Sequence, residues 1–222
     1  VYKRHGFNII FHYNSSASKA LEIQKELNEI RSDSCFILQA DFNNLTSIED
    51  LQKGVAKITD DLAVLVNNAS SFYPTPLKGA SVEEWNDLMA TNATTPLFLT
   101  QALLPFLMKG KGCVINISDT LAPSGIKNFS LYAGAKSALE GITKSLAKEL
   151  APEIRVNAIS PGAILWPEDE DLTEEQKKVR LAKVPLGRIG DPRDISSVAV
   201  FLSSAEYITG QVIKVDGGRS IS

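Results

Sequence analysis

Tyr132 and Lys136 are the two residues of this sequence whose types and spacing most clearly suggest chemistry, because they lie four apart in the run LYAGAK. The surrounding pattern predicts a helix that continues to Leu150, so both side chains share one helix face. A cation beside a phenol stabilises the phenolate, which lowers the phenol pKa from about 10 toward neutrality. Such a tyrosine can hand a proton to a substrate heteroatom. Taken alone, the same spacing is typical of a surface tyrosine beside a solvated lysine, so the rest of the chain must decide.

Regular helices and strands must position Tyr132 and Lys136. Short β-type runs alternate with helix-length segments, which predicts a parallel sheet covered by helices on both faces. Residues 16–30 carry apolar side chains at helical spacing, and Ser81 with Glu84 three residues on predicts a capping box. No repeat or composition shift interrupts the order, so we expect one domain over residues 1–222. The strands are expected at residues 8–12, 35–39, 63–66, 113–117, 155–159 and 211–215.

The segment from Ala163 to Val184 is expected to be an insertion that acts like a lid. It contains the acidic run Glu168 to Asp171, followed by a Thr173 to Gln176 capping pattern. We interpret the acidic run as the solvated start of a helix rather than as a metal site.

The first residues differ from the start of a dinucleotide-binding sheet, which begins with a strand, a glycine-rich turn and a helix whose N-terminus holds the pyrophosphate. Residues 1–5 are typical of the end of that helix, and Gly6 is typical of its C-terminal stop. The strand at residues 8–12 then corresponds to the second strand of such a sheet. We therefore expect the chain to be incomplete at its N-terminus, with the first strand and the glycine-rich turn absent.

Composition excludes several classes of function. The chain has 222 residues, 44% of them hydrophobic and 22% charged, with a net charge of -3, so no basic field is expected to attract nucleic acid or anionic lipid. Cys35 and Cys113 lie far apart, which argues against a disulfide framework or a metal site and favours a reducing compartment. The most apolar stretch, residues 97–108, is far too short to span a membrane. We expect a cytoplasmic protein that acts on a small molecule.

Polar residues at the ends of the expected strands supply the context that the tyrosine and lysine need. Asn67-Asn68-Ala69-Ser70 follows one strand, Asn92 lies in the next helix, Asn116-Ile117-Ser118-Asp119 ends another strand, and Ser160-Pro161-Gly162 follows a further one. In this order and spacing the chain resembles the short-chain dehydrogenase/reductase family, up to the Val-Asp-Gly-Gly run at residues 215–218. The resemblance implies a Rossmann-type, doubly wound α/β fold.

The resemblance also implies roles for individual residues. It implies that Tyr132 is the catalytic acid, that Lys136 binds the nicotinamide ribose and tunes Tyr132, and that Asn92 holds a proton-relay water. It implies a homotetramer built partly on the helices that contain Asn92 and Tyr132. It places further cofactor contacts at Asn68, Ala69, Ser70, Pro161, Gly162 and Ile164, and further substrate contacts at Ser70, Leu165 and Trp166.

Two departures from the family pattern narrow the substrate. The family places a serine thirteen residues before its tyrosine, where this chain has Asp119 and where Ser118 would point to the opposite face. The family's NNAG is NNAS here and continues into Ser71 and Phe72. Both features resemble the pteridine reductases, including relatives that reduce dihydromonapterin and dihydrofolate. That resemblance implies that Asp119 assists Tyr132 in delivering the proton and that Phe72 stacks the pterin against the nicotinamide.

The two features also have plainer interpretations and a physical rationale. A flat heteroaromatic ring gains from an aromatic face, and a carboxylate accepts hydrogen bonds from an aminopyrimidine edge. Against this, Phe72 could be a core aromatic in a proline-rich loop, and Asp119 could be a turn residue after a strand.

The sequence favours NADPH over NADH. An acid near the end of the second strand would bind the ribose 2′-hydroxyl of NAD and repel a 2′-phosphate, and no acid lies between Gly6 and Leu21. Instead His12, Ser15 and Ser16 offer polar groups at a helix N-terminus, where an anion is stabilised. Asp41 could contact the adenine or could equally cap the end of a strand.

Two alternatives to a pterin reductase are open at this point. The first is a short-chain reductase of another carbonyl compound, such as a 3-oxoacyl thioester, for which Asp119 and Phe72 would be incidental. The second is a nicotinamide-binding sensor without turnover, whose usual mark is a degraded catalytic Tyr or Lys. Both residues are intact here.

Overall fold

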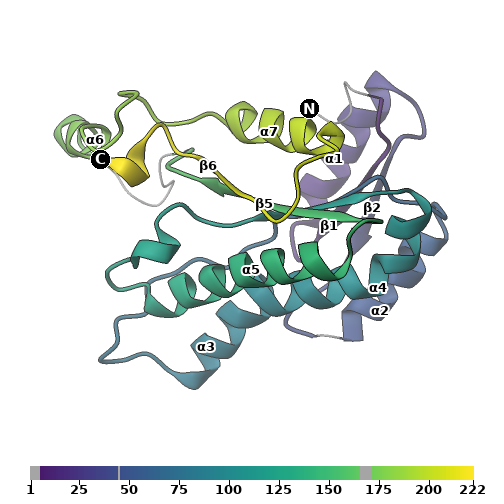
Figure 1. Ribbon diagram of the computed structural model, residues 1–222, viewed down its shortest axis with the longest axis horizontal. Helices are drawn as coiled ribbons and strands as arrows, with labels where there is room; N and C mark the ends of the chain where they lie inside the picture. Colours follow the sequence, from purple (N-terminus) through teal and green to yellow (C-terminus); the bar gives the residue numbers. More distant parts are fainter. Residues whose placement is uncertain (1–5, 45, 166–171) are drawn as a thin grey trace.

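The computed structural model describes residues 6–44, 46–165 and 172–222, and these form parallel strands covered by helices on both faces (Figure 1). The expected α/β fold of the Rossmann type is confirmed. The strands are β1 (Ile9–Tyr13), β2 (Cys35–Gln39), β3 (Val64–Asn67), β4 (Cys113–Ile117), β5 (Arg155–Pro161) and β6 (Val212–Val215). The α-helices are α1 (Ala17–Ile30), α2 (Thr46–Ala56), α3 (Val82–Met89), α4 (Thr95–Lys109), α5 (Ser130–Glu149), α6 (Glu174–Leu181) and α7 (Pro192–Ser204).

Three shorter helical segments complete these ranges. A π-helical turn, η2 (Ala90–Thr94), joins α3 to α4, and the 3₁₀ turns η3 (Ala122–Ser124) and η4 (Arg219–Ile221) follow β4 and β6. Each expected strand is present within two residues of its predicted ends. The largest difference is at β5, which continues to Pro161, where the strand still pairs in register with Val215.

The strands form two parallel groups. β1 pairs with β2, and the second group has the order β3-β4-β5-β6. Within the described ranges, β1 and β3 each have one hydrogen-bonded neighbour. The carboxyl ends of β3, β4 and β5 lie at one edge, since Asn67 is opposite Asn116 and Ile117 is opposite Ile159. This edge carries the polar residues that the sequence pattern singled out.

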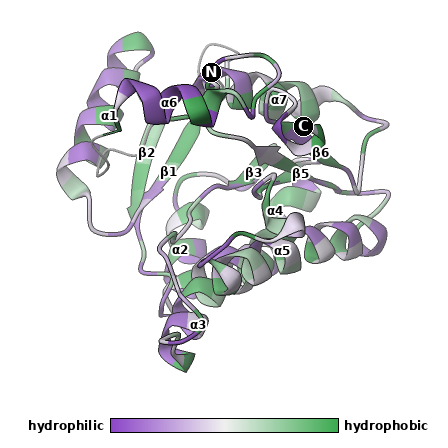
Figure 2. Ribbon diagram, turned by 90° about the vertical axis from the view of Figure 1, so that its left-hand side faces the viewer, coloured by the Kyte–Doolittle hydropathy of each residue, from purple (hydrophilic) through white to green (hydrophobic). Residues whose placement is uncertain are grey.

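Both faces of the larger group are apolar because side chains alternate along its strands. On β4, Val114 packs into a core with α2 and α4, whereas Cys113 and Ile115 pack against α7. Figure 1 shows the corresponding layers, with α4 and α5 on one side of the strands and α7 on the other. A helix that covers a sheet usually has one apolar face and one polar face. Figure 2 shows hydrophobic and hydrophilic residues mixed in this way along α1, α3 and α5.

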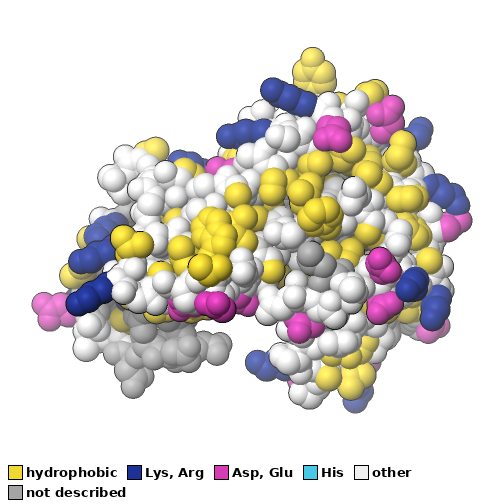
Figure 3. Space-filling view, turned by 90° about the horizontal axis from the view of Figure 1, so that it is seen from below, with side chains coloured by type: hydrophobic (Ala, Val, Ile, Leu, Met, Phe, Trp, Pro, Cys, Tyr) yellow, Lys and Arg dark blue, Asp and Glu magenta, His cyan; other side chains and the backbone are white. Residues whose placement is uncertain are grey.

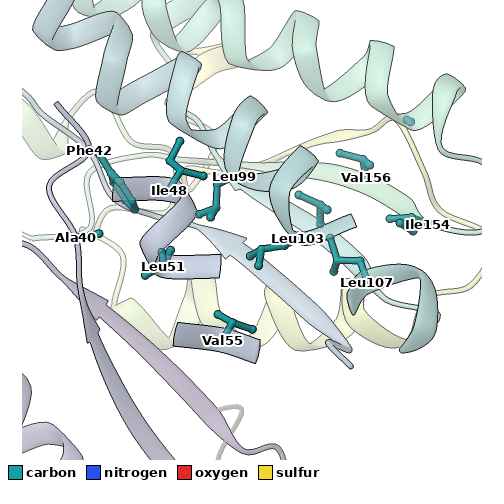
Figure 4. Packing of buried hydrophobic residues seen from close by; sticks show 12 residues of the cluster. Ala40, Phe42, Ile48, Leu51, Val55, Leu99, Leu103, Leu107, Ile154 and Val156 are labelled. Carbon is teal, nitrogen blue, oxygen red and sulfur yellow. The ribbon is translucent and has the colours of Figure 1, made fainter. Parts of the chain in front are cut away.

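The larger core lies between α2, α4 and the strands (Figure 4). Leu103 and Leu107 lie one turn apart on α4 and face Leu51 and Val55 of α2. Complete burial of one leucine side chain stabilises the folded state by roughly 1.5–3 kcal/mol. This packing supports α4 and hence the π-helical turn before it, which carries Asn92.

The predicted helix starts are confirmed where capping patterns supported them. The Glu84 amide donates to Ser81 Oγ at 3.1 Å and the Ser81 amide donates to Glu84 Oε2 at 2.8 Å. Thr173 and Gln176 form the same reciprocal pair at the start of α6. The acidic run at residues 168–171 and the expected helix tail at residues 1–5 lie outside the described residues. Gly6 has a φ of +87°, the left-handed conformation expected of a residue that stops a helix.

Two expectations, one about domain organisation and one about a lid, are not tested by the observed fold. The single domain over residues 1–222 and the lid-like behaviour of residues 163–184 stay predictions. No helix in the described ranges combines the length and the apolar character needed to cross a bilayer.

Candidate active site

Tyr132 and Lys136 lie in the first two turns of α5, with both side chains buried beneath the carboxyl end of β4. Helical spacing puts them on the same face, as the sequence predicts. Lys136 Nζ donates to the backbone oxygen of Ile117 at 2.8 Å and lies 5.9 Å from the centroid of the Tyr132 ring. The helix thus presents a phenol and an ammonium group together at the strand ends.

Asp119 is the residue that contacts the phenol. The Tyr132 hydroxyl donates to Asp119 Oδ2 at 3.1 Å, while Asp119 Oδ1 accepts a hydrogen bond from the Leu121 amide at 2.8 Å. Ser118 Oγ instead donates to Glu140 Oε1, further along α5, at 2.9 Å. The aspartate is therefore the residue that meets the tyrosine, as the predicted register expects, while the serine bonds a different residue of α5. The Leu121 bond also shows that Asp119 shapes the turn after β4, as the plainer interpretation expected.

Burial and charge set the protonation of this pair. Burial, together with the negative charge and the hydrogen bond of Asp119, raises the pKa of Tyr132 above its ordinary value. The prediction of a lowered phenol pKa is therefore wrong for this arrangement, because burial and Asp119 both raise it. Burial also lowers the pKa of Lys136 to about 8, although the charge of Asp119 acts in the opposite direction. At neutral pH the pair is a protonated phenol beside a mostly protonated amine.

An aromatic wall stands next to the phenol. Phe72 is 59% exposed, which rules out the alternative that it is a core residue. Its ring stacks on Phe129 with centroids 4.6 Å apart and meets Tyr132 edge-on at 4.8 Å. Sequence reasoning missed Phe129, which directly precedes α5 and has no local spacing that relates it to Phe72. The exposed aromatic faces offer a flat ligand an apolar surface.

Asn92 and Ser70 form a second polar group near this wall. Asn92 lies fully buried in the π-helical turn, and its Nδ2 donates to the backbone oxygens of Ser71 and Leu88, each at 2.9 Å. Its Oδ1 accepts a hydrogen bond from Ser70 Oγ at 2.7 Å. A π-helical turn interrupts the regular ladder and is common at functional sites. Asn92 thus fixes the start of the loop that carries Phe72, and its expected role at a relay water stays a prediction.

The expected cofactor residues lie at the strand ends of both groups. Ser15 and Ser16 are exposed at the start of α1, and neither side chain caps the helix. The His12 ring stacks on Phe42 at 4.1 Å, and its Nε2 lies 2.9 Å from the Ala40 backbone oxygen. Asp41 Oδ1 accepts from the Asn43 amide at 3.0 Å, which matches the strand-end cap that was its alternative role.

The remaining expected contacts lie after β3 and β5. Asn68, Ala69 and Ser70 are exposed directly after β3. Gly162 packs so closely after β5 that a Cβ there would lie 2.7 Å from Asp216 Cα. Ile164 lines a cavity of about 180 Å³ with Arg188, Asp194 and Asp216, whereas Leu165 is 69% exposed. Trp166 lies outside the described residues.

This set of donors fits a dinucleotide. A lysine ammonium carries three donors, and Ile117 accepts one of those of Lys136, so others can meet ribose hydroxyls. The exposed hydroxyls of Ser15 and Ser16 lie where a helix N-terminus stabilises an anion. No group of three or more His, Cys, Asp or Glu side chains in the described part of the chain could hold a metal ion.

Comparison with known proteins agrees with this geometry. A family model described as Enoyl-(Acyl carrier protein) reductase matches residues 1–220. The 3-oxoacyl-(acyl-carrier-protein) reductase FabG of Vibrio cholerae is 39% identical to the chain, over 79% of the chain and 75% of the relative. The chain belongs to the short-chain dehydrogenase/reductase family.

Other relatives carry different activities in their names. Pteridine reductase 1 of Leishmania tarentolae is 34% identical over 98% of this chain and 89% of its own length. The uncharacterized oxidoreductase YmfI of Bacillus subtilis is 33% identical over 96% of this chain and 88% of its own. Membership in the short-chain dehydrogenase/reductase family makes the protein an oxidoreductase, while the relatives divide between substrates.

Proposed function

We propose that this short-chain dehydrogenase/reductase uses NADPH to reduce a pterin or a dihydrofolate-type substrate. The observation that carries the proposal is the hydrogen bond from the Tyr132 hydroxyl to Asp119 Oδ2, next to the exposed ring of Phe72. The aromatic face suits a flat heterocycle, and the carboxylate suits its aminopyrimidine edge. The 34% identity to a pteridine reductase over almost the whole chain supports the same substrate class.

The residues of the site have distinct parts in this reaction. NADPH supplies the hydride when bound, and we assign its ribose to Lys136 and its 2′-phosphate to Ser15 and Ser16. Tyr132 donates the proton to the substrate nitrogen, and its raised pKa keeps it protonated until charge develops there. Lys136 then stabilises the phenolate that the transfer leaves. Asp119 accepts hydrogen bonds from the substrate edge and holds the Tyr132 hydroxyl in place.

A second candidate is the reduction of a 3-oxoacyl thioester. The 39% identity to the Vibrio cholerae FabG supports it. The same tyrosine and lysine would serve a ketone, but that substrate has no aminopyrimidine edge for Asp119. Steady-state rates of NADPH oxidation with biopterin, dihydrobiopterin, dihydromonapterin, dihydrofolate and a 3-oxoacyl thioester separate the two candidates. Binding of NADPH without turnover of any of them would favour the sensor alternative.

Turnover is expected to fall as the pH rises above about 8, because the pKa of Lys136 is lowered to about 8. Below that pKa the ammonium stabilises the developing phenolate, and above it the neutral amine does not. The measurement is kcat/KM for the substrate from pH 6 to 10. The variant Lys136→Met should be slow at all pH values and should lack this limb. A parent profile that stays flat to pH 10 contradicts the role given to the ammonium.

The cofactor preference is expected to favour NADPH over NADH by at least about tenfold in kcat/KM, a difference of roughly 1.4 kcal/mol. The physical reason is that no acid between Gly6 and Leu21 repels a 2′-phosphate. Changing Ser15 or Ser16 to Asp should shift the preference toward NADH by repulsion, and Ser32→Asp, an exposed position beyond α1, is the matched control. Equal use of both cofactors by the parent would refute this assignment.

Replacing Phe72 by Ala is expected to weaken pterin binding more than NADPH binding, because the ring offers a stacking face to the substrate alone. The expected loss is about fivefold to tenfold in the dissociation constant of the pterin, the usual scale of an aromatic pair. Titration by fluorescence quenching measures both ligands. Leu77→Ala, on the same loop and 84% exposed, is the control. An unchanged pterin dissociation constant would remove Phe72 from the binding site.

We propose that the chain forms a homotetramer built partly on the helices that contain Asn92 and Tyr132, which are the η2–α4 segment and α5. Figure 3 shows hydrophobic side chains gathered on the face seen from below the view of Figure 1, the side on which α3, α4 and α5 lie. The exposed large hydrophobic residues of α3 and α4 include Val82, Trp85, Phe98 and Met108. Contiguous apolar surface of this kind is typical of protein interfaces. Sedimentation equilibrium of the parent and of Phe98→Glu tests the assembly, which should weaken in the variant.

A further inference from the structure

The chain around Asp119 is held by two buried side chains that flank it. Ser118 and Thr120 are 4% and 2% exposed, and the hydroxyl of each is engaged in a hydrogen bond. Each reaches an acidic residue on a different element, Ser118 through Glu140 of α5 at 2.9 Å and Thr120 through Asp216 at 2.8 Å. Asp119 therefore lies between two anchors rather than on a free turn.

The second anchor fixes the point where the chain leaves the sheet. Up to Ser118 the backbone still pairs with β5, and the Thr120 amide makes one more bond, to the Pro161 oxygen at 3.1 Å. Beyond it the chain turns into the 3₁₀ segment η3. The Thr120 hydroxyl therefore makes a side-chain hydrogen bond to a distant segment just before this turn, and Asp119 immediately precedes it.

Asp216 is itself held firmly. Its Oδ1 accepts from the Gly218 amide at 2.9 Å, and its Oδ2 accepts from the Ser220 amide at 2.9 Å as well as from Thr120 Oγ1. Burial would raise the pKa of Asp216, but the hydrogen bonds from Ser220, Thr120 and Gly218 outweigh it and hold the pKa below its usual value. It is thus a carboxylate at neutral pH and a strong acceptor for Thr120.

We propose that Asp216 is a positioning residue for the reaction, acting through the Thr120 hydroxyl to hold the Asp119 carboxylate against Tyr132. This inference rests on the proposed role of Asp119 in proton delivery. Groups that carry a proton must be held within a fraction of an ångström of their productive geometry. The segment after β6 thereby supports the reacting groups, although the strand end that carries Asp119 lies almost a hundred residues earlier in the chain.

The test compares two changes at Thr120. Thr120→Val removes the hydroxyl with little change of shape, and we expect it to lower kcat about tenfold while the KM for NADPH stays within about twofold. Thr120→Ser keeps the hydroxyl and should recover most of that loss. Thr100→Val is the control, because it removes an equally buried threonine hydroxyl, one that donates to the Pro96 oxygen within α4. This control should keep the parent kcat.

A double-mutant cycle separates positioning from general destabilisation. In the Asp119→Asn background, Thr120→Val should cost less than about twofold in kcat, because the group that it positions is already lost. A tenfold loss that persists in that background overturns the proposal, and so does a Thr120→Val enzyme with the parent kcat. Should Thr120→Val fail to fold, the same cycle with Asp216→Asn decides.

Different results would overturn the proposed function and the positioning role of Asp216. The cycle is measured with whichever substrate the parent reduces, so a wrong substrate class leaves the positioning result intact. An Asp119→Asn enzyme with the parent kcat on that substrate removes the proposed role of Asp119 and the positioning role with it. An impaired Asp119→Asn enzyme beside an unimpaired Thr120→Val enzyme removes the positioning role alone.

Discussion

Replacing Tyr132 by Phe is expected to lower pterin turnover by about a hundredfold or more, the usual scale for removing a positioned acid. The change deletes one hydroxyl from a ring that stays buried against Phe72, so the fold should persist. NADPH binding should change little, because Lys136 and the strand ends are untouched. Single-turnover rates of NADPH oxidation measure the chemical step, and cofactor fluorescence measures binding.

The control for this change is Tyr207→Phe. Tyr207 is fully exposed, so its hydroxyl is solvated and its loss should leave kcat at the parent value. A Tyr132→Phe enzyme that keeps turnover within about threefold of the parent would contradict the assignment of Tyr132 as proton donor.

Asp119→Asn is expected to lower pterin turnover by a similar factor of about a hundred or more, while the fold and NADPH binding are kept. The amide has nearly the size of the carboxylate, so the bond from the Leu121 amide can persist. What is lost is the charge that accepts hydrogen bonds from the substrate edge and from Tyr132. The measurement is kcat with a dihydropterin, together with the dissociation constant of NADPH.

The pair of changes tests whether the two residues act as a unit. Asp119→Asn combined with Tyr132→Phe should cost far less than the product of the two single losses, because groups that deliver one proton together are not additive. Losses that multiply would mean that Asp119 and Tyr132 act independently, in conflict with the 3.1 Å bond between them.

The sequence predicted the part of this site that depends on regular elements. Helical spacing placed Tyr132 and Lys136 together, and strand alternation predicted that Asp119 rather than Ser118 meets Tyr132. These predictions succeeded because the pattern within an element repeats with a fixed period. The capping boxes at Ser81 and Thr173 were predictable for the same reason, since both partners lie within one helical turn.

Contacts between distant segments could not be predicted in this way. The stack of Phe72 on Phe129 joins residues of two loops, and the bond from Thr120 to Asp216 joins segments 96 residues apart. No local period relates such residues, so their contact depends on how the layers pack. The pKa of Tyr132 was predicted in the wrong direction because burial, its largest cause, cannot be judged from the spacing of a lysine.

The central claim, reduction of a pterin assisted by Asp119, is tested most directly by the substrate preference of the parent and of Asp119→Ser. The quantity to measure is kcat/KM with NADPH for dihydrobiopterin, dihydromonapterin, dihydrofolate and a 3-oxoacyl thioester. The account predicts that the parent prefers one of the first three over the thioester by at least about tenfold. It also predicts that Asp119→Ser, which installs the wider family's residue, loses that pterin activity. A parent that prefers the thioester, or an Asp119→Ser enzyme that reduces pterins as well as the parent does, would contradict it.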